Sequence, residues 1–248
     1  MRKFGLIGYP LGHSFSRNYF REKFERAAIT DCLYSNYEMD SLSAFPFILE
    51  DPELEGLNVT IPYKQLIIPY LHQKDPVVQE IDACNCIRIN NGLLTGYNTD
   101  VTGFEVSLSQ KLTETDKRAL ILGTGGSSKA VAWVLKKKGI DFLYVSRNPS
   151  GSGNQIRYED LSAEILRSHT LIINSTPLGM SPGTDTCPAL PFEEIGREHY
   201  LFDLVYNPAK TLFLEKGEAR GARIKNGADM LAIQAEASWE IWNAKSGR

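Results

Sequence analysis

The stretch from Arg118 to Ala130, R-A-L-I-L-G-T-G-G-S-S-K-A, decides the fold of the second half of the chain. An apolar run ends at Gly123, and Gly125 and Gly126 precede a run of good helix formers. A strand, a glycine turn and a helix in this order present backbone N–H groups at a helix N-terminus, where a pyrophosphate binds. One glycine permits the tight turn, and another lets phosphate oxygens approach a backbone without a Cβ. The spacing G-x-G-G departs from the usual dinucleotide fingerprint, so a plain strand-to-helix turn is the alternative.

The next apolar strand, 142–145, ends on Ser146, Arg147 and Asn148. At this place an Asp or Glu would accept a hydrogen bond from the free 2′-hydroxyl of an adenosine ribose. Arg147 offers a guanidinium instead, which suits a 2′-phosphate. Taken alone, Arg147 could equally be a solvated surface charge. Together with the glycine turn it favours NADP over NAD as the cofactor.

Length and composition limit the classes of protein. The 248 residues suffice for one large domain or two modest ones, and the net charge of -3 argues against nucleic acid as a partner. No apolar run approaches the roughly 20 residues that cross a bilayer, and the N-terminus does not resemble a signal peptide. The four cysteines are scattered without a histidine cluster, which argues against a metal site or a disulfide framework. We therefore expect a cytoplasmic protein that binds a small molecule, as a monomer or a homodimer.

Short apolar strands alternate with helical patterns along the rest of the chain, which predicts an α/β fold with parallel pairing. The first part has expected strands at 4–8, 34–39 and 56–62, helices at 18–28, 42–49 and 66–71, and a hairpin at 86–96 around Asn90-Asn91-Gly92. After a connecting helix at 101–112, a doubly wound sheet is expected from strands at 118–123, 142–147, 170–176 and 200–206, and a last helix at 229–242. Ligands bind beyond the carboxyl ends of such strands, which indicates the loops 174–180 and 203–208.

Polar groups gather in the loops of the first part. Ser14 and Ser16 are two residues apart, so both hydroxyls could point one way from an extended segment, although they could equally be turn residues. Asn58 and Thr60 lie on one face of their predicted strand beside Lys64, and an exposed polar face on an edge strand is the other interpretation.

Asp100 and Thr99 lie between the hairpin and the connecting helix, where either could simply cap the helix for about 1 kcal/mol. Lys64 and Asp100 would also be natural partners for moving a proton at a hydroxyl-bearing carbon. A lysine ammonium in a cleft that excludes water stabilises a developing alkoxide.

Several short motifs are distributed along nearly the whole chain. They are G-H-S-F-S at 12–16, N-V-T-I-P-Y-K at 58–64, A-C-N at 83–85, N-T-D-V-T-G at 98–103, N-S-T-P-L-G-M at 174–180, and G-A-D-M-L with Q-A at 227–231 and 234–235. With these motifs the chain resembles the shikimate dehydrogenase family. The resemblance implies two α/β domains with a cleft between them. Residues 1–100, completed by a helix at 228–248, would be the substrate-binding catalytic domain, and residues 101–227 the Rossmann-type NADP-binding domain.

The resemblance also implies residue roles. Lys64 would be the catalytic acid and base, with Asp100 as its partner. The substrate-binding residues would be Ser14, Ser16, Asn58, Thr60, Asn85, Tyr206 and Gln234. The cofactor-binding residues would be Gly123, Thr124, Gly125, Gly126 and Ser127 at the pyrophosphate, Ser146, Arg147 and Asn148 at the 2′-phosphate, and Thr176 and Gly227. No metal is implied.

The expected activity is the reversible NADPH-dependent reduction of 3-dehydroshikimate to shikimate in aromatic amino-acid biosynthesis. Some residues depart from the family pattern: Arg17 replaces a proline, Cys86 replaces a threonine, and no second arginine follows soon after Arg147. The alternatives are a quinate/shikimate dehydrogenase that uses NAD and a non-catalytic ligand-binding protein on the same scaffold.

Overall fold

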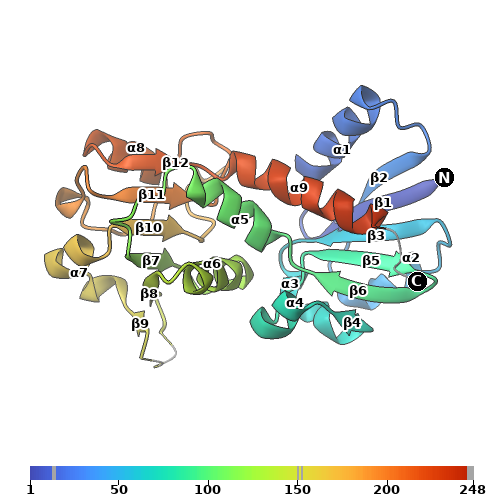
Figure 1. The fold of residues 1–248 in the computed structure, drawn as a ribbon, viewed down its shortest axis with the longest axis horizontal. Coiled ribbons are helices and arrows are strands. Elements are labelled where there is room, and N and C mark those ends of the chain that lie inside the picture. Colours follow the sequence, from blue (N-terminus) through green and yellow to red (C-terminus); the bar gives the residue numbers. More distant parts are fainter. Residues whose placement is uncertain (13–14, 150, 152, 245–248) are drawn as a thin grey trace. The chain divides into compact units, whose positions relative to one another are not determined.

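The computed structural model describes residues 1–12, 15–149, 151 and 153–244. The chain forms two compact units, which we call unit 1 (Met1–Thr102 with Leu231–Arg248) and unit 2 (Gly103–Met230) (Figure 1). Each unit is an α/β structure around one six-stranded sheet.

The sheet of unit 1 has the strand order β2-β1-β3-β5-β6-β4. Its strands are β1 (Arg2–Gly8), β2 (Cys32–Glu38), β3 (Leu54–Val59), β4 (Gln73–Lys74), β5 (Cys86–Asn90) and β6 (Leu93–Tyr97). β1 pairs in parallel with β2 and β3, as the alternating pattern predicted, whereas β5 is antiparallel to both β3 and β6. The β5–β6 hairpin turns at Asn91 and Gly92, which both have positive φ.

Between residues 42 and 71, the helices of unit 1 are shorter and more broken than the sequence predicted. They are α1 (Phe15–Arg26), the 3-10 turns η1 (Leu42–Ala44) and η2 (Ile68–Tyr70), α2 (Phe45–Ile48), α3 (Tyr63–Leu66) and α4 (Pro76–Ile81), with α5 (Asp100–Ser109) and α9 (Ala228–Asn243) at its limits. α4 was not predicted, although Asp75 caps it and Pro76 occupies its first turn. The single helix expected at 42–49 is divided into η1 and α2.

The two faces of this sheet are covered by different elements. α1 and α9 contribute to an aromatic cluster with Phe4 on one face, and α2, α3 and α4 pack on the other face (Figure 1). Trp242 of α9 stacks on Phe4 at 4.9 Å between ring centroids, and its indole nitrogen donates to the Ile87 carbonyl. A Cβ on Gly56 would lie 2.4 Å from this indole, so only glycine lets β3 approach it. The C-terminal helix is therefore part of the core of unit 1.

The sheet of unit 2 is parallel throughout, with the order β12-β11-β10-β7-β8-β9. Its strands are β7 (Arg118–Leu122), β8 (Asp141–Val145), β9 (Gln155–Ile156), β10 (Leu171–Asn174), β11 (Tyr200–Asp203) and β12 (Arg223–Lys225). The remaining elements are α6 (Gly126–Lys137), η3 (Tyr158–Asp160), α7 (Ala163–Ser168), η4 (Phe192–Glu194) and α8 (Leu212–Ala219). The four predicted strands are present, and the two that the sequence did not indicate, β9 and β12, are the short edge strands.

A buried carboxylate joins the carboxyl ends of β10 and β11. Asp203 accepts hydrogen bonds from the Asn174 amide at 2.9 Å, from the Val205 backbone and from the Thr211 hydroxyl. Asn174 in turn accepts from the backbone and the hydroxyl of Thr176. Asp203 thereby fixes the start of both loops that follow these strands.

Across the described residues, no helix has both the length and the apolar character that a membrane span requires. All four cysteines are free thiols.

Replacing Trp242 by alanine should destabilise unit 1, because the change opens a cavity against Phe4 and leaves the Ile87 carbonyl without its donor. We expect a loss of about 3–5 kcal/mol in the free energy of unfolding, measured by urea denaturation followed by circular dichroism. The control is Phe47→Ala, since Phe47 is 70% exposed and its loss should change stability by less than about 0.5 kcal/mol. Equal unfolding midpoints for the two variants would contradict the packing of α9 described above.

Asp203 should make the stability of the chain depend on pH. Burial raises the pKa of its carboxyl to about 6, against an ordinary value of about 3.9, so the folded chain binds the proton more tightly than the unfolded chain. The free energy of unfolding should therefore fall as the pH rises from about 4 to about 6, by about 1.4 kcal/mol for each pH unit in that window. Asp203→Asn is uncharged and should lack this contribution. A wild-type minus variant difference that stays constant from pH 4 to 7 would refute this assignment.

Candidate active site

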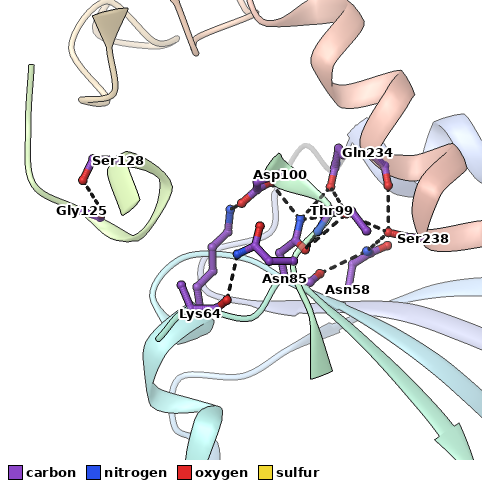
Figure 2. A network of polar contacts seen from close by, with 11 residues as sticks. Asn58, Lys64, Asn85, Thr99, Asp100, Gly125, Ser128, Gln234 and Ser238 are labelled. Carbon is purple, nitrogen blue, oxygen red and sulfur yellow. Dashed lines mark hydrogen bonds and ion pairs between the residues drawn. The ribbon is translucent and has the colours of Figure 1, made fainter. Parts of the chain in front are cut away.

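Lys64 and Asp100 form an ion pair in unit 1. Lys64 lies on α3 and Asp100 is the first residue of α5, and Lys64 Nζ is 2.6 Å from Asp100 Oδ2 (Figure 2). Their side chains are only 14% and 8% exposed. The other carboxylate oxygen, Oδ1, accepts from the Asn85 amide at 2.9 Å. One oxygen of Asp100 therefore contacts the Lys64 ammonium group, and the other is held by Asn85. These contacts are more than a helix cap would require.

Asn85 is the centre of the polar network around this pair. Its side-chain oxygen accepts from the backbone N–H of Thr99, and its side-chain nitrogen also lies 3.1 Å from the Gln234 oxygen. The hairpin explains this meeting: Cys86 pairs with Tyr97, so the residues just before β5 and just after β6 emerge at the same end of the sheet. α9 adds Gln234 to this end (Figure 2).

Asn58 extends the network through the sheet. It is buried on β3, which lies between β1 and β5, so the edge-strand alternative is wrong. Its amide nitrogen donates to the Ser238 hydroxyl and to the Asn85 carbonyl, and its oxygen accepts from the Tyr34 hydroxyl. Burial raises the pKa of Tyr34 well above its ordinary value, and Ser16 opposes that rise. Ser16 is itself buried on α1.

The structure brings together both predicted catalytic residues, Lys64 and Asp100, and several of the predicted substrate-binding residues of unit 1: Asn58, Asn85 and Gln234. Thr60 follows β3 and is half-buried, with its methyl group facing Gly8. Ser14 lies outside the described residues. Tyr206 is a half-buried residue of unit 2, and its role toward a substrate stays a prediction.

The sequence did not single out Tyr34 or Ser238, and it treated Thr99 only as a possible cap. The Thr99 hydroxyl lies 3.2 Å from the Ser238 hydroxyl and donates to Asn85. Ser238 is four residues after Gln234 on one helix, a spacing that places both on the same face and could have identified it. No signal in the sequence distinguishes Tyr34 from the other tyrosines.

The glycine turn of unit 2 has the geometry of a phosphate cradle. Gly123 has a φ of +99°, and a Cβ there would lie 2.9 Å from the methyl group of Thr176. A Cβ on Gly125 would meet nothing within 4 Å, so the space over this residue is open. α6 begins at Gly126, which puts the free N–H groups of a twelve-residue helix beside that space. The two glycines thus differ as expected, and these residues fit a pyrophosphate.

The other predicted cofactor residues lie at the same carboxyl edge or near it. Thr124 is exposed and Ser127 is half-buried on α6. After β8, the Ser146 hydroxyl accepts from the Asn148 backbone, and Arg147 is exposed. Gly227 packs on the Leu204 carbonyl so closely that a Cβ would lie 2.4 Å from its oxygen. No group of three or more potential metal ligands is found in the described part of the chain.

Comparisons with known proteins show the family of the chain. Residues 6–87 match the family model described as the shikimate dehydrogenase substrate binding domain. The NADP(+) shikimate dehydrogenase of Desulforamulus reducens is 33% identical over 96% of this chain and 88% of its own length. A crystal structure of shikimate dehydrogenase 1 from Peptoclostridium difficile is 33% identical with a TM-score of 0.86, over 100% of this chain and 94% of that one. The Thermus thermophilus enzyme in complex with NADP(H) and shikimate is 28% identical with a TM-score of 0.87, over 100% and 95% of the chains. The chain belongs to the shikimate dehydrogenase family.

Proposed function

We propose that this chain catalyses the reversible reduction of 3-dehydroshikimate to shikimate with NADPH, as a step of aromatic amino-acid biosynthesis. The observation that carries the proposal is the Lys64 ammonium, held 2.6 Å from a carboxylate whose other oxygen is fixed by Asn85. A proton donor in a fixed orientation is what the reduction of a ketone requires on the protein side.

The chain's residues have distinct tasks in this reaction. When bound, NADPH supplies the hydride. Lys64 gives a proton to the carbonyl oxygen of the substrate as that oxygen becomes a hydroxyl, and it takes the proton back in the reverse direction. Asp100 keeps the ammonium oriented, and Asn85 keeps Asp100 from turning.

The hydroxyl and amide groups around this pair suit a polyhydroxylated carboxylic acid. We assign the binding of the shikimate carboxylate and ring hydroxyls to Ser14, Ser16, Asn58, Thr60, Asn85, Asp100, Gln234 and Tyr206. This set contains both hydrogen-bond donors and acceptors, which suits hydroxyl groups because each hydroxyl both donates and accepts.

The cofactor residues support NADP in particular. We assign the pyrophosphate to the turn from Gly123 to Ser127, with Thr176 and Gly227 at the nicotinamide half. Ser146, Arg147 and Asn148 would receive the 2′-phosphate, for which a guanidinium is a good partner and a carboxylate would not be. Free thiols at the cysteines support a reducing compartment such as the cytoplasm.

Replacing Lys64 by alanine should reduce kcat by about 100-fold or more, because positioned proton transfer is lost. KM for shikimate should change much less, since the binding hydroxyl and amide groups remain. The assay follows the appearance of reduced nicotinamide with shikimate and NADP. Lys74→Ala is the matched control, because Lys74 is an exposed lysine of the same unit. A Lys64→Ala variant with nearly the wild-type kcat would remove lysine from the mechanism and favour a different proton donor.

A further inference from the structure

Ser238 occupies a place in α9 that the needs of the helix do not explain. The residue lies in the interior of this sixteen-residue helix and is completely buried, and alanine would be the better helix former there. Its hydroxyl donates to the Gln234 carbonyl one turn earlier, at 2.9 Å. A bond of this kind slightly destabilises a helix rather than supporting it. The role of the hydroxyl therefore depends on its contacts outside the helix.

The hydroxyl of Ser238 connects three segments of unit 1 (Figure 2). From β3, the Asn58 amide donates to it at 2.9 Å. From the segment after β6, the Thr99 hydroxyl lies 3.2 Å away, and the Gln234 carbonyl on α9 accepts its proton. Each of these segments also carries a group of the candidate active site. One buried hydroxyl therefore sets the spacing of all three segments.

The partners of Ser238 are in direct contact with side chains that we propose to bind the substrate. The Asn85 amide donates to the Thr99 hydroxyl at 3.0 Å and to the side-chain oxygen of Gln234 at 3.1 Å. The Asn58 amide also donates to the Asn85 backbone carbonyl, at 3.2 Å. Ser238 thus lies one contact behind Asn85. Because it is completely buried, it can influence a ligand only through these neighbours.

Removal of the hydroxyl would loosen these neighbours. One N–H of the buried Asn58 amide would lose its acceptor, which is unfavourable, so the amide would shift toward another one. The Asn85 carbonyl, which accepts from the same amide, would shift with it. The Lys64–Asp100 pair keeps its own contact and the bond from the Asn85 side chain. Substrate binding should therefore suffer more than proton transfer.

We propose that Ser238 is a positioning residue of the substrate site, whose hydroxyl holds the Asn85 and Gln234 amides in the orientation that binds the substrate. The inference rests on the proposed function and deepens it by assigning a role to a residue that touches no ligand. Without the hydroxyl, KM for shikimate should rise and kcat should change much less. The reason is that the loosened groups bind the ground state and the transition state alike.

The first test measures the Kd of shikimate by titration calorimetry, together with kcat and KM. Ser238→Ala should raise Kd and KM by about 10-fold, the factor that corresponds to one net hydrogen bond, and should leave kcat near the wild-type value. Ser238→Thr and Ser238→Val give side chains of nearly the same shape, of which only threonine keeps the hydroxyl. The threonine variant should therefore bind shikimate more tightly than the valine variant.

Ser107→Ala is the matched control. Ser107 is likewise a completely buried serine of a helix, and its hydroxyl donates to Asp229, outside the network around Asn85. This variant should lose stability and keep the wild-type Kd and KM. An unchanged Kd in Ser238→Ala, equal Kd values for the threonine and valine variants, or an equal weakening in Ser107→Ala would overturn the proposal.

A measurement on the free protein separates the inference from the activity. In NMR spectra of isotope-labelled protein, the side-chain amide signals of Asn85 and Gln234 should shift in Ser238→Ala and Ser238→Val and return toward the wild-type positions in Ser238→Thr. Unchanged signals would overturn the proposal whatever the activity. If shikimate binds and Ser238→Ala weakens its binding, but reduced nicotinamide does not form with the wild type, the inference stands and the proposed activity fails. If the wild type does not bind shikimate, the proposed function fails and the amide signals alone decide the inference.

Discussion

The candidate active site depends on the Asp100 carboxylate, because both of its oxygens accept hydrogen bonds. Asp100 holds the Lys64 ammonium with one oxygen and the Asn85 amide with the other, in a place where little of either charged side chain reaches water. A largely buried ion pair is costly to desolvate, so it persists only where further hydrogen bonds satisfy its remaining lone pairs. The Asn85 amide supplies one of these bonds. The β5–β6 hairpin holds Asn85 and Asp100 at one end of the sheet, and α9 adds Gln234 there. The C-terminal helix is therefore needed to complete the network of the first unit.

Unit 2 also contains a buried carboxylate that accepts several hydrogen bonds, at the carboxyl ends of β10 and β11. Asp203 is buried, and three hydrogen-bond donors offset part of the cost of burying its charge. It also connects the loop after β10 to the loop after β11. Thr176, which restricts Gly123 to glycine, is held through Asn174 by the same carboxylate. In both units, buried partners therefore set the orientation of polar side chains at the ends of strands.

The sequence predicted the parts of the structure that have local causes. The glycine turn before α6 and the Asn91-Gly92 hairpin could be predicted because Gly123, Asn91 and Gly92 adopt a positive φ. What it missed depends on contacts between distant residues. Asn58 could be assigned to an edge strand because its neighbours β1 and β5 come from elsewhere in the chain. β9 has only two residues, too few for a periodic pattern. Tyr34 and Ser238 join the network through hydrogen bonds to Asn58, which is distant from both in the sequence.

The most direct measurement of the central claim is an initial-rate assay of the purified wild-type protein with shikimate and either NADP or NAD. The account predicts formation of reduced nicotinamide with a higher kcat/KM for NADP than for NAD, and little or no activity with quinate in place of shikimate. Turnover that favours NAD would leave the Lys64–Asp100 pair in place but contradict the assignment of the 2′-phosphate to Arg147 and its neighbours. Absence of turnover with either cofactor, despite binding of shikimate, would contradict the account as a whole and point to a ligand-binding protein.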